Sequence, residues 1–108
     1  MNPPKNLIAR VRTELEGQPG LSEKRMFGST AFLIQGKLCI GARAERLMCR
    51  IDPATQPELL RREGCTRVVM KGRKMSGYVY VAAEALLDRA ALVYWIQRSL
   101  TQVRSIAQ

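Results

Sequence analysis

The first half of the chain alternates short apolar runs with glycine and charged residues. Apolar residues fill 31–34 and 38–40 and, apart from Arg50, 47–51, with turns predicted at Gly36-Lys37 and around Ala44-Glu45. This pattern is typical of sequential antiparallel strands. With the second turn centred on Ala44-Glu45, one strand face is apolar and the other mostly cationic, and a register shifted by one residue is the alternative. The first face would hold Leu38, Ile40, Ala42, Leu47, Cys49 and Ile51, and the second Lys37, Arg43, Met48 and Arg50.

A second pair of strands is predicted in residues 66–82. An apolar run at 68–70 is followed by a basic turn around Gly72 and then by a segment in which valine and tyrosine alternate. Alternation with a period of two is typical of a half-buried strand. The alternating residues are Tyr78, Val79, Tyr80 and Val81.

Apolar residues recur at helical spacing in residues 7–15, 53–63 and 88–103. Gly64 ends the second of these segments, and Asp88 can cap the third. The third carries a stripe of Leu92, Val93, Ile96, Leu100 and Val103, with Trp95 beside it. The order α-β-β-β-α-β-β, followed by one or two helices, predicts a single α+β domain over residues 1–108. It would have an antiparallel sheet of about five strands with helices packed on it, and residues 1–5 and 105–108 would be loose ends.

The positive charge of the chain is concentrated in the predicted strands. The net charge is +9, and the segments 24–51 and 66–82 account for all of it. A basic sheet face with tyrosines fits an acidic protein partner or a nucleic acid. The alternative is a solvated face that binds polyanions only weakly. The candidate partner surface consists of Arg43, Arg46, Arg50, Arg67, Lys71, Arg73, Lys74, Tyr78 and Tyr80.

The two strand tyrosines leave two interpretations open. If Tyr78 and Tyr80 are exposed, they mark an interface, because tyrosine and arginine are enriched at interface hot spots. Two copies could then pair through the sheet as a homodimer. If a helix covers them, they belong to the core. A self-associating structural or chaperone-like domain is therefore the alternative to a module that binds another molecule.

Several kinds of chemistry lack the residues they need. The chain has no histidine, and its three cysteines have no CxxC spacing, so we expect no catalytic residue, no metal and no cofactor. No small-molecule substrate is evident. No apolar run approaches the roughly 18–20 residues of a membrane helix, and the first residues lack a secretory signal pattern. We therefore expect a cytoplasmic protein that is not an enzyme and does not enter a membrane.

Three segments resemble the N-terminal domain of the TfoX (Sxy) proteins. They are Lys24-Arg25-Met26-Phe27-Gly28, residues 32–38 and residues 72–81, and the likeness runs from about Leu7 to about Val103. The resemblance implies a single-domain family member with an α+β fold similar to secretion-chaperone-like domains. It also implies a role in regulation, because the family is known from bacterial regulators of natural competence that act with the catabolite activator protein at promoters.

The segment 24–28 itself has two interpretations. It could be a functional entry to the first strand, with Gly28 allowing a partner backbone to approach. Alternatively, it is a strand start in which Met26 and Phe27 anchor the first helix and Gly28 forms a bulge.

Overall fold

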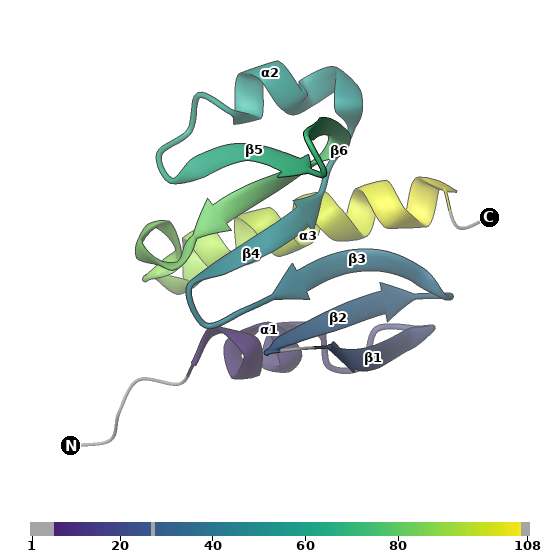
Figure 1. Cartoon of the computed structure of the whole chain (residues 1–108). Coiled ribbons are helices and arrows are strands. Elements are labelled where there is room, and N and C mark those ends of the chain that lie inside the picture. The colour runs from purple at the N-terminus through teal and green to yellow at the C-terminus, as the bar shows by residue number, and fades with distance from the viewer. Residues whose placement is uncertain (1–5, 27, 107–108) are drawn as a thin grey trace.

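The computed structural model describes residues 6–26 and 28–106. Within them the chain forms one antiparallel sheet with the strand order β1-β2-β3-β4-β6-β5, together with three α-helices (Figure 1). The α+β class and the predicted order of elements are confirmed, with one strand more than the five expected. The strands are β1 (Leu21–Met26), β2 (Ser29–Ile34), β3 (Lys37–Ala42), β4 (Arg46–Arg50), β5 (Cys65–Met70) and β6 (Arg73–Ala82). The helices are α1 (Leu7–Leu15), α2 (Gln56–Leu59) and α3 (Arg89–Ile106), with short 3₁₀ turns η1 (Pro53–Thr55) and η2 (Ala83–Leu86).

The helices pack on one face of the sheet. In Figure 1, α1 and α3 lie behind the strands, and α3 contacts β3 and β4. Leu59 of α2 joins the same core, and Arg62 just beyond α2 reaches the rings of Tyr94 and Trp95 on α3. Strand side chains such as Phe32 and Leu47 are fully buried in this layer. Within the described part of the chain, no helix covers the opposite face.

Alternation along β4 and β6 follows the sequence prediction. Ala42 pairs with Leu47 and Ile40 with Cys49, so the β3–β4 turn is centred on Ala44-Glu45 as predicted. The prediction that Leu38 lies on the same buried face as Ile40 and Ala42 is wrong. Between Phe32 and Leu33 the β2–β3 register shifts, which inserts Cys39 as an extra residue in β3. Cys39 and Ile40 are therefore both buried. Leu38 instead pairs with Leu33, which is not one of the buried residues of β2.

A larger irregularity interrupts β6. Arg67 pairs with Val79 and Val69 with Lys74, so four residues of β6 span the distance covered by one residue of β5. Gly77 lies in this bulge with φ +86°, a conformation that favours glycine. Its N–H donates to Oε1 of the buried Gln56 at 2.8 Å, which ties the bulge to α2.

Strand β1 was not anticipated, and it forms one edge of the sheet. Its residues Ser22 to Arg25 are exposed, so the segment lacks the alternation that reveals half-buried strands. The β2–β3 and β5–β6 hairpins each turn on two consecutive residues of positive φ, as type I′ turns do. These residues are Gln35-Gly36, one position before the predicted turn, and Lys71-Gly72.

The final helix buries four of the five residues of the predicted stripe, Leu92, Ile96, Leu100 and Val103. Trp95, 3% exposed, and Ser99 lie in the core-facing stripe, whereas Val93 is only half-buried. The helix also continues through Ser105 and Ile106, which were expected to be loose, while residues 1–5 and 107–108 lie outside the described range. No helix in the described range has the length and apolar character needed to span a bilayer.

Candidate partner-binding face

The uncovered face of the sheet is hollowed. A cavity of about 210 Å³ is lined by residues of β2, β3, β4, β6 and β5 and of the β3–β4 turn. Because β2 and β5 are separated by three strands in the sheet order, the sheet must curl for both to reach one cavity. We call this surface the concave face. Its residues are the cavity lining, Ser29, Gly41, Arg43, Arg46, Met48, Met70 and Tyr80, together with the neighbouring Arg50 and Tyr78.

The guanidinium group of Arg46 lies over an aromatic ring of the concave face. Its Cζ is 3.7 Å from the ring centroid of Tyr80, the residue diagonal to it across the β4–β6 ladder. Its Nε is buried and has no hydrogen-bond partner among the described residues. The negative quadrupole of the ring attracts the half-buried guanidinium group. Arg46 is therefore held in one orientation by stacking rather than by an ion pair.

Arg50 forms a second arginine–tyrosine pair on the same two strands. Its Cζ is 4.9 Å from the ring centroid of Tyr78, the residue directly opposite it on β6. The β3–β4 ladder ends at Ile40–Cys49. Beyond that point Arg50 Nε donates to the carbonyl oxygen of Leu38 at 2.6 Å. The arginine side chain thus occupies the place where strand pairing stops, and the bond fixes its position.

The described carboxylates form their ion pairs elsewhere. Arg12 pairs with Glu23 and Arg89 with Glu14, each at 2.9 Å. The hydrogen bond from each arginine lowers the pKa of its carboxyl partner. No described carboxylate forms an ion pair with an arginine of the concave face. The positive charge of this face is therefore not neutralised within the described chain.

The predicted surface divides between two sides of the sheet. Arg43, Arg46, Arg50, Tyr78 and Tyr80 lie on the concave face. Arg73 pairs with Met70 of the same cavity and shares its side. Arg67 and Lys74 lie on the other side instead and line a hollow of about 240 Å³ with residues of α2. Arg67 of β5 is there because it pairs with the core residue Val79, and Lys74 because the β6 bulge changes the alternation of that strand. Lys71 lies at the tip of the β5–β6 hairpin.

The sequence predicted only part of the apolar lining of the concave face. Met48 was assigned to the side of Arg50, and it lies there. Gly41 and Met70 were not singled out, although both line the cavity. The alternation of β3 places Gly41 on the same face as Met48, so that signal was available. Met70 lies near Met48 only because the sheet curls, which the sequence pattern does not specify.

The segment 24–28 belongs to the first hairpin. Lys24 to Met26 end β1, and Gly28, with φ +80°, lies in the β1–β2 connection rather than at a bulge within a strand. Arg25 and Gly28 line a hollow of about 420 Å³ together with Arg12. Phe27, and with it the predicted anchoring contact, lies outside the described residues.

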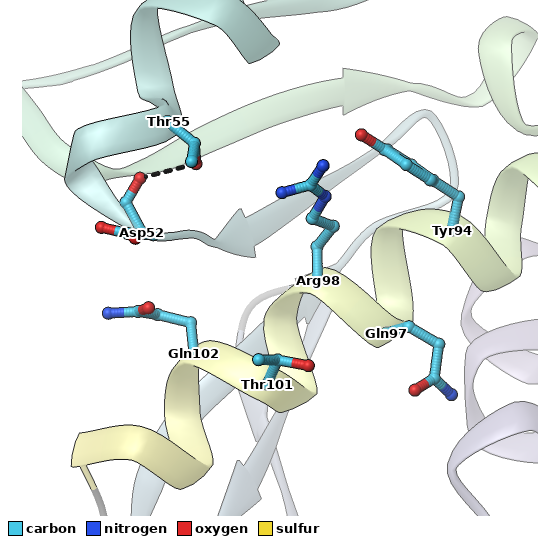
Figure 2. A pocket seen from close by; sticks show the side chains of 7 residues that line it. All are labelled: Asp52, Thr55, Tyr94, Gln97, Arg98, Thr101 and Gln102. Atoms are coloured by element: carbon cyan, nitrogen blue, oxygen red, sulfur yellow. Dashed lines mark hydrogen bonds between the residues drawn. The ribbon is translucent and has the colours of Figure 1, made fainter.

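A further groove separates η1 from α3 on the helical side (Figure 2). It has a volume of about 410 Å³ and is lined mostly by polar side chains, with Asp52 and Thr55 on one wall and Arg98 on the other. Asp52 Oδ1 accepts a hydrogen bond from the Ala54 N–H, and the Thr55 hydroxyl donates to the Asp52 carbonyl oxygen. Two of the three oxygen acceptors of Asp52 therefore serve the local turn. The sequence did not single out this groove.

The three cysteines are free and buried. Burial raises the pKa of the Cys39 thiol to about 12 and that of Cys65 to about 11. Burial also raises the pKa of Cys49, while the neighbouring Ser99 hydroxyl acts in the opposite direction. Thiols of this kind behave as small apolar groups. Among the described residues, no cluster of cysteine and carboxylate side chains could hold a metal ion.

Comparison with known proteins identifies the family. A search of curated proteins and a search of solved structures each return no match. The family profile described as the TfoX N-terminal domain matches residues 13–103, from the end of α1 to the last turns of α3. The match includes every strand of the sheet and all residues of the concave face. The chain therefore belongs to the TfoX N-terminal domain family.

Proposed function

We propose that this protein is a non-catalytic regulatory module that binds an anionic macromolecule through the concave face. One observation carries the proposal. Two arginines, Arg46 and Arg50, are stacked on tyrosine rings of a face that no described helix covers, and neither forms an ion pair with a described carboxylate. An unneutralised cation held in a fixed orientation is more useful for binding than for stability.

The stacking lowers the cost of binding. A free arginine side chain loses rotamer freedom when it is captured by a ligand, at about 0.5–1.5 kcal/mol for each such side chain. Arg46 and Arg50 are already restrained by Tyr80, Tyr78 and the Leu38 carbonyl group. A guanidinium group that is stacked on its flat side keeps N–H donors at its edge for a carboxylate or phosphate.

The chemistry of the chain supports binding rather than catalysis. It has no histidine to act as a base near neutral pH. Its thiols are buried, and the pKa of Cys39 is raised to about 12, which opposes formation of a nucleophilic thiolate. Free buried cysteines also fit a reducing compartment, and we place the protein in the cytoplasm on this ground.

Membership of the TfoX N-terminal domain family supports a regulatory role like that of the competence regulators. Self-association through the concave face is the weaker alternative. Stacking two copies face to face would bring Arg43, Arg46 and Arg50 of one copy against the same residues of the other. Like charges opposed in this way weaken an interface, so the charge favours a partner of opposite sign.

Binding of polyglutamate and of a short DNA duplex, titrated over a range of salt concentrations, tests the proposal. We expect at least one probe to bind, with affinity that falls as salt rises. The double variant Arg46→Gln/Arg50→Gln should weaken that binding at least tenfold. Arg61→Gln, which removes one charge from an exposed position after α2, should change it less than twofold. The absence of binding at low salt, or equal losses in the two variants, would refute the proposal.

A further inference from the structure

Building on the proposed function, we infer that the partner is a protein segment in which acidic residues flank one large apolar side chain. The apolar side chain would occupy the cavity of the concave face, and the flanking carboxylates would meet the arginines around it. The inference rests on the close association of an apolar cavity and unneutralised cations.

The cavity provides an apolar receptor of limited size. Its walls include Met48, Met70 and Tyr80, and Gly41 leaves space on β3 where any other residue would place a side chain. Methionine side chains adapt their shape to an inserted group. Met70 is 43% exposed, and burial by a partner would remove this apolar surface from water. At about 210 Å³, the cavity has room for one large side chain rather than for a ligand of drug size.

The cations lie at the border of the same cavity. Arg43 and Arg46 line it, and Arg50 follows along β4. Residues 64–83, which supply β5, the hairpin turn and β6, contain no aspartate or glutamate. The complement of this surface is a segment that carries apolar and acidic groups together, since charge of opposite sign is needed close to the inserted side chain.

Nucleic acid fits the concave face less well. Sequence-tolerant binding of single strands relies on bases that stack on free aromatic rings. In this protein Tyr80 and Tyr78 each carry a guanidinium group on one face, and both residues are otherwise half-buried against the sheet. A duplex would present phosphates to the arginines but no group for the apolar cavity.

Two peptides distinguish the inference from the proposed function. Both are made of glutamate and aspartate, and they differ at one central position, which is leucine in one and serine in the other. We expect the wild-type protein to bind the leucine peptide about 10- to 100-fold more tightly, the range that corresponds to burying one such side chain. The comparison uses the intact protein, so it does not depend on the folding of a variant.

A variant of Gly41 tests the cavity from the protein side. A Cβ atom at Gly41 would meet only Met48 side-chain atoms, at 3.7 and 3.8 Å, so a side chain can be added without a backbone clash. Gly41→Leu should fill the cavity and abolish the preference for the leucine peptide, while salt-dependent binding of the serine peptide remains. Ala90→Leu, which places a leucine at an exposed position on α3, should leave the preference unchanged.

The outcomes separate two failures. Equal affinity for both peptides, or a preference that survives Gly41→Leu, overturns the inference but leaves arginine-dependent binding intact. Tighter binding of a DNA duplex than of the leucine peptide through Arg46 and Arg50 overturns it as well, in favour of a nucleic-acid partner. If the wild-type protein binds none of the probes at low salt, the proposed function itself is overturned.

Discussion

The hydrogen bond between Gln56 and Gly77 should be a main support of the concave face. It is 2.8 Å long, Gln56 is 8% exposed, and Gly77 is buried within the β6 bulge. Gln56→Met keeps the length of the side chain but removes the acceptor, which leaves the Gly77 N–H buried without a partner. Such a group costs about 1–3 kcal/mol. We therefore expect the free energy of unfolding to fall by about 1–3 kcal/mol, and Tm by roughly 4 °C for each kcal/mol in a domain of this size.

Urea unfolding followed by circular dichroism measures this loss, and amide hydrogen exchange locates it. The Gly77 amide should exchange slowly in the wild-type protein and much faster in Gln56→Met. Gln97→Met makes the same chemical change at an exposed position of α3 and should alter stability by less than about 0.5 kcal/mol. If the two variants lose the same stability, or if Gly77 stays protected in Gln56→Met, the bond does not support the bulge and this reasoning is refuted.

Three further results are expected. A double-mutant cycle of Arg46→Met and Tyr80→Leu, measured by urea unfolding, should give a coupling energy of about 1 kcal/mol, and a value near zero would contradict the stacking. Arg12 lowers the pKa of Glu23, so the contribution of this ion pair to stability is present above the pKa of Glu23 in the unfolded chain and is lost as the pH falls. Glu23→Gln should therefore flatten the acid dependence of stability in unfolding titrations, and an unchanged dependence would show that the pair is inert. Burial raises the pKa of Cys39 to about 12, so stability should decline as the pH rises from about 9 towards 12. A thiol reagent at pH 8 should modify Cys39 only after unfolding, and rapid labelling of the folded protein would contradict this expectation.

The parts of the fold that the sequence predicted are those with a regular burial period. The alternation of Val79 and Val81 with the tyrosines depends only on one buried face, and β6 follows it. Strand β1 escaped prediction because Ser22 to Arg25 are exposed, so the segment is recognised as a strand by its pairing with β2. The position of Leu38 was misjudged because the extra residue in β3 depends on pairing between strands, which no single-strand pattern records.

The candidate site shows the same division. Arg46, Arg50, Tyr78 and Tyr80 were grouped correctly, because regular alternation on two neighbouring strands places them together. The basic residues of the second segment were grouped by charge alone. Arg67 lies on the helical side because it pairs with Val79 of the core, and the bulge at Gly77 moves Lys74 to the same side. The cavity beside Met70 depends on the curl of the whole sheet, a property of all the strands together rather than of any one segment.

The placement of every described helix on one side of the sheet has a consequence for how this fold can diversify. Side chains that stabilise the domain point into the helical layer, whereas those of the concave face point away from it. Substitutions at positions such as Gly41 and Met48 can therefore accumulate with little penalty in foldability. Relatives built on the same framework could acquire different recognition preferences by exchanging a handful of residues, while the architecture that carries them stays unchanged.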